Sequence, residues 1–501
     1  MSNYDLFAPY PISPAKITRL AGYGSANYKV EDLTGQTYLV KHHMDPESFK
    51  RIEAENKIMA HLSAQLPIEV SSPSYDKLIT YPDGSFSRML CFINGIFLKD
   101  VEATPELSFN FGKIIALSHQ SLGSYKTVEI EAYDHKWNLM NCLDSVEDMD
   151  LISDPSQRKI VNYFLEQYKQ VCADPLRKLP KQIIHNDLND WNVLVSDNEI
   201  KGIIDFGDLC YAPKICDLAI AMAYLLLDTP TPLIRAVDLI EGYLSIQKLD
   251  EKEIELLYYL IPARLCVSVI SSNKERSQGN TEDYIFVTEN KAWALLSKWF
   301  EMNPILFRNS LMKPLGFQQL NSVPTLISKR KKHLSSALSL SFDDPIHMTS
   351  AAFQYMYAAN GDTYLDAYNN IPHVGHCHPE VTQAAARQIN KLNTNTRYLY
   401  EALMGYSERL LKYFPNALDK VIFVNSGSEA SDLAIRIAQN HTSNKHILVL
   451  ADGYHGHTRM GIDISAYKFD GKGGDGVNEN ITVLPLPKIY QGLQSSGKAY
   501  A

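Results

Sequence analysis

The sequence predicts a two-lobed α+β domain followed by a truncated α/β domain, and three patterns in its 501 residues support this. Short strand patterns surround one helix in residues 17–97. Residues 105–300 are mostly helical in pattern, and a strand pair interrupts them between Ile183 and Phe206. From Ser341 onward, strand-like and helical segments alternate, which is typical of βαβ units with a parallel sheet. We therefore expect lobes at residues 1–96 and 97–322, a linker at 323–340 and a further domain at 341–501.

Composition and charge exclude several classes of function. Hydrophobic residues make up 45% of the chain and charged residues 21%, as in folded soluble proteins. The net charge of −9 argues against nucleic acid or a membrane surface as the main partner, because both need clustered Lys and Arg. The seven cysteines are scattered, and the N-terminus lacks the basic start and apolar run of a secretory signal. We expect a cytoplasmic protein with reduced thiols.

The first lobe contains a recognisable strand and helix start. Residues 38–41 form an apolar strand pattern that ends in Lys41. Asp45 can cap the helix that follows, and Pro46 suits its first position. Apolar residues then recur at helical spacing and predict a buried stripe, at Ile52, Ile58, Met59 and Leu62. A second strand pair is predicted at 78–81 and 87–93.

The most informative stretch is a predicted hairpin within residues 183–208. Two apolar strands flank Asp197-Asn198, a pair that suits a tight turn. Antiparallel pairing around that turn sets Asn192 roughly opposite Ile203. The open end of the hairpin then brings together three oxygen-bearing side chains, because cross-strand neighbours lie about 5 Å apart. These side chains are Asp187, Asn192 and Asp205.

That grouping suits phosphoryl transfer. The transfer of a γ-phosphoryl group needs hard oxygen ligands for Mg²⁺ and a carboxylate that orients the attacking hydroxyl. Asp187 is the predicted catalytic base, and Asn192 and Asp205 are the predicted metal ligands. His185 is expected to support the loop. The alternative is an ordinary polar hairpin with capping aspartates, but the H-x-D-x-x-x-x-N and I-I-D-F-x-D patterns seldom coincide by chance.

The motifs His185-Asn-Asp187…Asn192 and Ile204-Asp-Phe-Gly-Asp208 resemble those of the aminoglycoside phosphotransferase and choline kinase superfamily, over roughly residues 10–300. The resemblance implies a protein-kinase-like fold that uses ATP with Mg²⁺. It also implies that Lys41 pairs with the nucleotide phosphates and that a helix carboxylate holds this lysine. Glu55 fits that role best, with Glu53 as the alternative.

Two further features follow from the same resemblance. The turn at residues 21–27 looks like the phosphate-covering loop, with Gly22, Gly24 and Ser25 as nucleotide-binding residues. The loop 188–192 is closer to hydroxylysine kinase-like enzymes than to antibiotic kinases. The implied acceptor is a small amine-bearing alcohol, and carboxylates of the helical lobe are expected to bind its ammonium group.

A second constellation lies in residues 421–456. Residues 421–430 have the pattern of a strand, a glycine turn and a helix start, which is an anion site, and a turn at 451–456 carries Tyr454. These segments resemble class III aminotransferases, particularly phospholyases, which have the fold-type I architecture and bind pyridoxal phosphate. The resemblance implies that Gly427 and Ser428 hold the cofactor phosphate, that Tyr454 covers its ring, and that a homodimer forms through this part.

The resemblance also predicts what this region lacks. In the family the Schiff-base lysine lies far beyond Tyr454, and four lysines of this chain come too early for that role: Lys468, Lys472, Lys488 and Lys498. We expect only part of the pyridoxal phosphate site, in a fragment of a longer bifunctional enzyme or a decayed domain. A zinc site at residues 373–378 is the weaker alternative for the histidines there.

The leading hypothesis from the sequence is a magnesium- and ATP-dependent kinase for a hydroxyl on a small amino alcohol or hydroxylated amino acid, such as hydroxylysine or ethanolamine. Two alternatives stay open. The main function is pyridoxal phosphate-dependent aminotransferase or phospholyase chemistry of a longer protein, or the chain is a non-catalytic nucleotide-binding scaffold.

Overall fold

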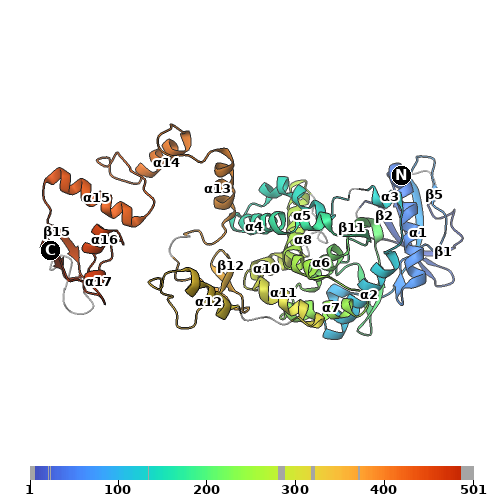
Figure 1. Cartoon of the computed structure of the whole chain (residues 1–501). Coiled ribbons are helices and arrows are strands. Elements are labelled where there is room, and N and C mark those ends of the chain that lie inside the picture. Colours follow the sequence, from blue (N-terminus) through green and yellow to red (C-terminus); the bar gives the residue numbers. More distant parts are fainter. Residues whose placement is uncertain are drawn as a thin grey trace, which may run out of the picture. The chain divides into compact units, whose positions relative to one another are not determined.

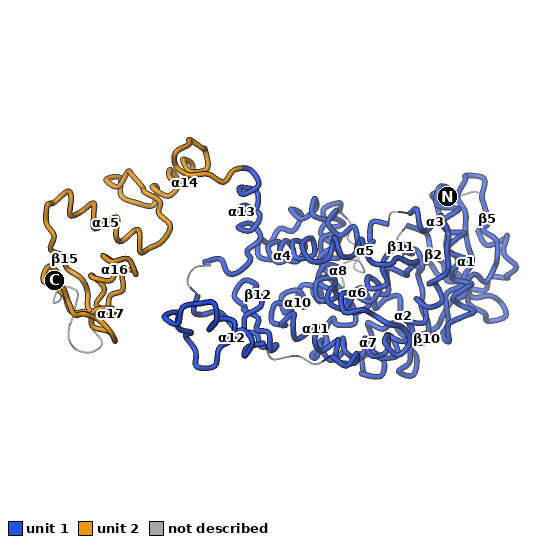
Figure 2. The backbone as a smooth tube through the Cα atoms, viewed as in Figure 1, with its two compact units in different colours: residues 1–391 blue, residues 392–501 orange. Residues whose placement is uncertain are grey.

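The computed structural model describes residues 6–20, 22, 24–133, 135–279, 288–317, 322–369 and 373–486. Its contacts divide the chain into two compact units, residues 1–391 (unit 1) and residues 392–501 (unit 2), which Figure 2 colours separately. Unit 1 contains a strand-rich N-terminal lobe and a helical lobe, as the sequence predicts (Figure 1). Two-lobed α+β architecture is thus confirmed for the first part of the chain.

The N-terminal lobe is a five-stranded antiparallel sheet with one long helix. The strand order is β1-β2-β3-β6-β5. The strands are β1 Pro14–Leu20, β2 Ala26–Asp32, β3 Thr37–His43, β5 Ile79–Thr80 and β6 Phe86–Cys91. A short 3-10 turn, η1 Pro46–Ser48, leads into α1 Phe49–Gln65. The Asp45 side chain accepts a hydrogen bond from the Glu47 backbone N–H, so Asp45 caps this 3-10 turn, whereas the α-helix itself begins at Phe49, three residues after the predicted first position Pro46.

The helical lobe is built around α8, which spans Glu251–Ser277. This helix has the length and composition of a membrane span, but 78% of its apolar window is buried within the protein, as in the core helix of a folded domain. The other helices of the lobe are α2 Pro105–Leu122, α3 Val128–Glu131, η3 Leu139–Leu151, α4 Pro155–Val171, α5 Ala173–Lys178, α6 Lys214–Leu225, α7 Pro232–Leu244, α10 Glu289–Trp299, α11 Pro304–Met312 and η5 Lys313–Leu315.

Two glycines let α2 and α7 cross at very close range. A Cβ on Gly112 would lie 1.9 Å from the Leu239 carbonyl oxygen, and a Cβ on Gly242 would lie 1.8 Å from the Phe109 carbonyl oxygen. Both nearest atoms belong to the backbone, which cannot change rotamer to make room as a side chain can. Only glycine therefore fits at these two positions of the crossing.

The predicted hairpin is formed by β9 Val193–Ser196 and β10 Glu199–Ile203. Its turn residues, Asp197 and Asn198, have φ angles of 51° and 63°, the left-handed pair of a type I′ turn. The predicted register was wrong by one residue, because a bulge between Ile200 and Gly202 shifts the pairing and sets Ile203 opposite Val193. Two short strands, β4 Glu69–Val70 and β7 Ile96–Phe97, flank the hairpin in its sheet, and β8 Lys181–Ile184 with β11 Cys210–Pro213 form a separate two-stranded sheet.

The segment after residue 322 packs differently from the expected linker and domain. Residues 323–333 form a helix, α12 Val323–His333, which buries none of its residues. A three-stranded antiparallel sheet follows, with strands β12 Met348–Ala352, β13 Tyr355–Ala358 and β14 Thr363–Leu365. It packs on the helical lobe, since the Phe353 ring centroid lies 5.1 Å from that of Phe300. The predicted domain boundary at 341 stays a prediction, whereas the division between compact units falls at Leu392.

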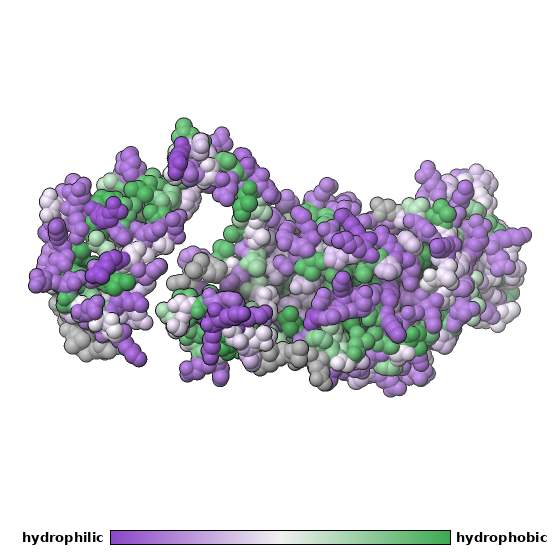
Figure 3. Space-filling view, viewed as in Figure 1, coloured by the Kyte–Doolittle hydropathy of each residue, from purple (hydrophilic) through white to green (hydrophobic). Residues whose placement is uncertain are grey.

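Unit 2 contains a small parallel sheet covered by helices. Strands β15 Ile447–Leu450 and β16 Ile481–Leu484 pair in parallel, in agreement with the predicted sheet type. The predicted strand at 421–424 was wrong: the segment has no regular structure and pairs with no strand of the described residues. The helices are α14 Glu401–Leu411, α15 Gly427–Thr442, α16 Arg459–Asp463 and α17 Ala466–Phe469, and α13 Pro379–Lys391 belongs to unit 1. Figure 3 shows apolar residues on the surface of this unit, Leu399 and Tyr413 among the most exposed.

Candidate active site

The predicted site begins with an ion pair between the two lobes of unit 1. Strand β3 carries Lys41, which is 8% exposed, and Asp205 follows the end of β10. Lys41 Nζ lies 2.8 Å from Asp205 Oδ1. The lysine charge lowers the pKa of Asp205 to about 2, so this carboxylate is ionised at neutral pH. Asp205 has a φ of 58°, a left-handed conformation that is uncommon outside glycine and often found at functional sites.

Asp187 lies in a cradle of hydrogen-bond donors. Asn189 Nδ2 lies 3.0 Å from both carboxylate oxygens. Asn192 Nδ2 donates to Asp187 Oδ2 at 2.7 Å and to the Asp187 carbonyl at 2.9 Å. On the other side, Arg264 Nη2 donates to Asp187 Oδ1 at 2.8 Å. These contacts fix the carboxylate in one orientation, as a base that receives a proton from a positioned hydroxyl requires.

Burial and the neighbouring charges have opposing effects on the pKa of Asp187. Burial raises the pKa of Asp187 to about 7, and the neighbouring carboxylates of Asp208 and Asp205 add to the rise, while the Arg264 guanidinium lowers it. A carboxyl with a pKa near the working pH is suited to general base catalysis. The hairpin pattern brings Asp205 close to Asp187, but it does not predict the opposing charge of Arg264, which lies on α8, 77 positions away.

Asn192 and Asp205 fit the magnesium role that was predicted for them. The Ile204 N–H donates to the Asn192 carbonyl at 3.0 Å, which holds the two ligand-bearing segments together. Because the Asn192 amide nitrogen faces Asp187, its Oδ1 remains available to a cation, beside the ionised Asp205. Two protein oxygens suffice, since Mg²⁺ commonly takes one or two protein ligands and completes its shell with waters and nucleotide phosphates.

No cluster of three or more His, Cys, Asp or Glu side chains with metal-binding geometry occurs among the described residues. The histidines of residues 373–378 are therefore not gathered into a zinc site. His376 Nε2 instead lies 2.7 Å from Asp366 Oδ2.

The expected partner of Lys41 is engaged elsewhere. Glu55 is fully buried and forms ion pairs with Arg51 and, at 3.0 Å, with Arg88, whereas Lys41 pairs with Asp205. Arg51 also donates to the Gly207 carbonyl at 3.0 Å, which links α1 to the loop after Asp205. The predicted Lys41–Glu55 pair thus differs from the structure, because two arginines compete for the carboxylate. The alternative, Glu53, pairs with Lys57 on the exposed face of α1.

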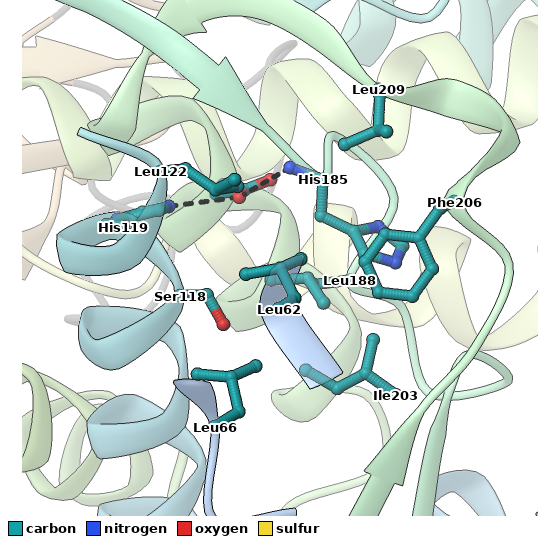
Figure 4. Close-up of a pocket in the computed structure, with 11 residues that line it drawn as sticks. Leu62, Leu66, Ser118, His119, Leu122, His185, Leu188, Ile203, Phe206 and Leu209 are labelled. Carbon is teal, nitrogen blue, oxygen red and sulfur yellow. Dashed lines mark hydrogen bonds and ion pairs between the residues drawn. The ribbon is translucent and has the colours of Figure 1, made fainter. Parts of the chain in front are cut away.

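Asp217 on α6 anchors the loop that contains Asp187. Asp217 accepts hydrogen bonds from the backbone N–H groups of His185 and Asn186, at 3.0 and 2.7 Å. Its Oδ2 also lies 3.0 Å from His119 Nε2. Figure 4 shows this group at the edge of a small apolar pocket lined by leucines, with the His185 ring beside Phe206. These contacts give Asp217 a structural role in this loop.

His185 supports the same loop from the inside. Burial lowers the pKa of His185, which indicates a neutral ring. Its Nε2 lies 3.1 Å from the Ile204 carbonyl, and its Nδ1 lies 3.3 Å from the Asp187 N–H. A neutral tautomer that donates from Nε2 and accepts at Nδ1 satisfies both contacts. His185 therefore positions the backbone of Asp187.

The predicted phosphate loop has the features of a tight turn. Gly24 has a φ of 73°, and a Cβ on Gly22 would lie 1.9 Å from Asn27 Nδ2. The Ser25 hydroxyl donates to Asn27 Oδ1 at 2.9 Å. Residues 21 and 23 of this turn lie outside the described residues. The nucleotide-binding role of Gly22, Gly24 and Ser25 stays a prediction.

In unit 2 the predicted cofactor residues lie at the start of α15 and in the turn after β15. Gly427 is the first residue of α15, and a Cβ there would meet nothing within 4 Å. The Ser428 hydroxyl lies 3.1 Å from His457 Nδ1. The Tyr454 ring is about half exposed, with the Lys468 Nζ 5.7 Å from its centroid. A helix terminus with open space and an exposed ring is compatible with pyridoxal phosphate, and Lys488 and Lys498 lie outside the described residues.

Arg264 is the principal residue that sequence reasoning missed. It lies on α8, 77 positions from the base it contacts, inside a long apolar helix. A lone arginine among buried aliphatic residues was the one available signal, because arginine is seldom buried without a partner. Its Trp137 and Tyr224 neighbours come from two further segments.

Two family models match the chain in succession. Residues 16–252 match the model of the phosphotransferase enzyme family, and residues 341–494 match that of class III aminotransferases. The first match contains every predicted kinase residue, and the second contains Gly427, Ser428 and Tyr454.

Curated relatives divide in the same way. A hydroxylysine kinase of Danio rerio is 27% identical over 317 residues, which cover 58% of this chain and 88% of that protein. An alanine–glyoxylate aminotransferase 2-like protein of Drosophila melanogaster is 38% identical over 187 residues, 37% of this chain and 38% of that protein. Ethanolamine-phosphate phospho-lyase homolog 1 of Caenorhabditis elegans is 34% identical over 187 residues, 37% of this chain and 40% of that protein. The chain thus spans well under half the length of these two aminotransferase-type relatives.

Proposed function

We propose that this chain, which joins a domain of the phosphotransferase enzyme family to a class III aminotransferase region, phosphorylates a hydroxyl of a small amino alcohol or hydroxylated amino acid with ATP and Mg²⁺. The observation that carries the proposal is the cradle of Asp187 next to the Lys41–Asp205 ion pair. A fixed base, a lysine and two oxygen ligands meet there, which is the set of groups that phosphoryl transfer requires.

Each residue has a defined part in the proposed reaction. Asp187 accepts the proton of the acceptor hydroxyl as the oxygen attacks the γ-phosphorus, and the bond to the ADP oxygen breaks. Lys41 Nζ neutralises phosphate charge, and Asn192 and Asp205 would hold the magnesium ion. When bound, that ion supplies charge neutralisation and orientation of the phosphates. Asn189 keeps the Asp187 carboxylate oriented toward the acceptor.

The test is an acceptor screen with the full chain and Mg-ATP. Amino alcohols and hydroxylated amino acids are supplied in turn, and ADP release is measured together with the phosphorylated product. Asp187→Asn is expected to remove most turnover, because it deletes the base without changing the size of the side chain. Asp174→Asn is the matched control, since Asp174 is a surface residue whose side chain is 81% exposed. Turnover by Asp187→Asn at the wild-type rate would refute the assignment of Asp187 as the catalytic base.

A non-catalytic role gives a different pattern in the same screen. Nucleotide binding by the wild-type chain, with no acceptor phosphorylated and no difference between Asp187→Asn and wild type, would favour a nucleotide-binding scaffold. The presence of Lys41, Asp187, Asn192 and Asp205 at one site supports catalysis instead.

A second function is favoured by the match of residues 341–494 to class III aminotransferases. In a longer protein, Gly427, Ser428 and Tyr454 would hold pyridoxal phosphate, whose ring stabilises negative charge on a bound amine. The kinase product, a phosphate ester of an amino alcohol, is the type of substrate that a phospholyase eliminates. Equilibrium dialysis of the full chain against pyridoxal phosphate tests this part, because binding at Gly427, Ser428 and Tyr454 needs no Schiff-base lysine; no retention of the cofactor would count against it. A cytoplasmic location and a homodimer through this region belong to the same proposal.

A further inference from the structure

The first sheet of the aminotransferase region lies in unit 1, together with the helical lobe. The match to class III aminotransferases begins at residue 341, whereas unit 1 extends to residue 391 (Figure 2). Strands β12, β13 and β14 thus belong to the aminotransferase region by sequence, yet they pack against the helical lobe. The lobe meets the sheet at a surface that includes Tyr163, Phe300 and Asn303, which we call the docking face.

Phe353 is the apolar centre of this contact. It lies between β12 and β13 and is 7% exposed. Its ring centroid lies 5.2 Å from that of Tyr163 and 5.1 Å from that of Phe300. The backbone here is held in place, because the N–H groups of Phe353 and His376 each donate to the carbonyl of the other residue at 2.8 Å. A side chain that is held in its bound position before contact loses little conformational entropy on docking.

Asn303 binds the sheet and caps a helix of the lobe at the same time. It is 1% exposed, and its Nδ2 donates to the carbonyls of Ala358 and Asp362, at 2.9 and 2.8 Å. These two residues lie at the ends of the turn between β13 and β14. Its Oδ1 accepts from the N–H groups of Ile305 and Leu306, at 2.7 and 3.2 Å, and so caps α11. The amide nitrogen thus serves the sheet, and the amide oxygen serves the lobe.

Two hydroxyl groups of the sheet donate to carbonyls just after α10. Tyr357, which is 2% exposed, donates to the Phe300 carbonyl at 2.7 Å, and Thr363 donates to the Glu301 carbonyl at 3.1 Å. Carbonyls at the C-terminal end of a helix have no partner within the helix, and α10 ends at Trp299. Buried carbonyls need a donor. The docking face therefore presents polar groups, as well as aromatic rings, that the sheet satisfies.

We propose that the docking face of the helical lobe binds the first sheet of the aminotransferase region, and that this binding keeps the two regions together without the peptide connection between them. Residues 334–344, which form that connection, are exposed and contain no helix or strand. The contacts of Phe353, Asn303 and Tyr357 supply the affinity instead. The inference goes beyond the proposed kinase function and does not depend on it, since no reacting group takes part.

Cleavage of the connection in the folded protein tests the proposal. The recognition site of a sequence-specific protease is inserted into the full chain after Leu340, an exposed position. Cleavage then yields residues 1–340 and residues 341–501 as separate polypeptides. Gel filtration at about 1 μM should show them eluting together, which requires a Kd below that concentration. Elution as two separate species would overturn the proposal.

A single substitution assigns the binding to the docking face. Asn303→Asp keeps the oxygen that caps α11, because aspartate caps a helix as well as asparagine does. It removes both donors to the sheet and sets a carboxylate oxygen next to the carbonyls of Ala358 and Asp362. The Kd of the cleaved pair, from a dilution series, should rise by about 10- to 100-fold, the value of the two hydrogen bonds. Asn444→Asp, at an exposed position where the side chain also accepts from a backbone N–H, should leave the Kd unchanged.

A second substitution tests the apolar part of the contact. Phe353→Ala removes the ring that packs on Tyr163 and Phe300, so the cleaved fragments should separate. Tyr413→Ala, at a position that is 88% exposed, is the control and should leave them together. If the wild-type fragments stay together and neither Asn303→Asp nor Phe353→Ala raises the Kd, binding through the docking face is refuted. If circular dichroism shows that a variant fails to fold, cleavage of the wild-type protein decides the proposal alone.

Discussion

Replacement of Asp217 by Asn should loosen the loop that contains Asp187, the proposed catalytic base. Asp217 is 1% exposed and receives three hydrogen bonds, from the backbone N–H groups of His185 and Asn186 and from the His119 ring. Asparagine retains the shape but offers one acceptor oxygen in place of two. In either orientation of the amide, its NH₂ group faces an N–H donor of the backbone or of the His119 ring. An NH₂ group cannot accept a hydrogen bond from that donor.

The magnitude follows from that geometry. One hydrogen bond to a charged acceptor is lost, worth about 1.5–3 kcal/mol, and one buried N–H is left without an acceptor, which costs about 1–3 kcal/mol. The two values partly describe the same group, so we expect a loss of about 3 kcal/mol in the free energy of unfolding of unit 1. Turnover should fall as well, because Asp187 directly follows the released residues, whereas the KM for ATP should change little.

Urea denaturation followed by tryptophan fluorescence measures this effect. All four tryptophans of the chain lie in unit 1, at positions 137, 191, 293 and 299, so the signal reports that unit alone. Asp174→Asn is the control, because its side chain is 81% exposed. An Asp217→Asn protein within about 0.5 kcal/mol of wild type, the usual range for surface changes, would refute the reasoning.

Three further predictions concern unit 1. Gly242→Ala should destabilise it by about 3 kcal/mol or prevent folding, because the new Cβ would lie 1.8 Å from the Phe109 carbonyl oxygen; urea denaturation measures this. Burial lowers the pKa of His43 from 6.5 to about 2, so below pH 6.5 the unfolded chain binds a proton that the folded chain does not. The free energy of unfolding should therefore fall by about 1.4 kcal/mol per pH unit below that value. His43→Leu should reduce this slope. Lys41→Met should lower kcat/KM for ATP by about 10- to 100-fold, since it removes the cation next to Asp205, with little change in stability.

Each of these has its own control. Gly123→Ala, at the end of α2 in the same unit, places its Cβ 3.3 Å from the nearest atom, the His119 carbonyl oxygen, and should cost much less; an equal effect of both glycine changes would contradict the crossing argument. His61→Leu serves as the comparison for His43; a wild-type slope in His43→Leu would show that other groups set the acid sensitivity. Lys50→Met changes a lysine in the same lobe; if it reduces activity as much as Lys41→Met does, the assignment of Lys41 fails.

Local patterns predicted which residues of the candidate site lie together, but not the residues that contact and orient them. Lys41, Asp187, Asn192 and Asp205 could be found because strand alternation and turn chemistry act over a few residues. The bulge after Ile200 shifted the register by one, since nothing in the hairpin pattern marks an extra residue.

The supports come from tertiary contacts that no short pattern encodes. Arg264 reaches the base across 77 positions, and Arg51 and Arg88 compete successfully for Glu55. The apolar run at 421–424 shows that tertiary contacts can also prevent a predicted element. Its residues favour a strand, but they form none because they pair with no described strand.

The hydrogen bond from Arg51 to the Gly207 carbonyl joins α1 of one lobe to the loop after Asp205 in the other. Because the same guanidinium is anchored to Glu55, it transmits displacement in both directions. A rotation of the strand-rich lobe around a nucleotide would therefore pull on the backbone that follows Asp205. The contacts of Arg51 thus link the position of α1 to the backbone beside Asp205, the proposed magnesium ligand.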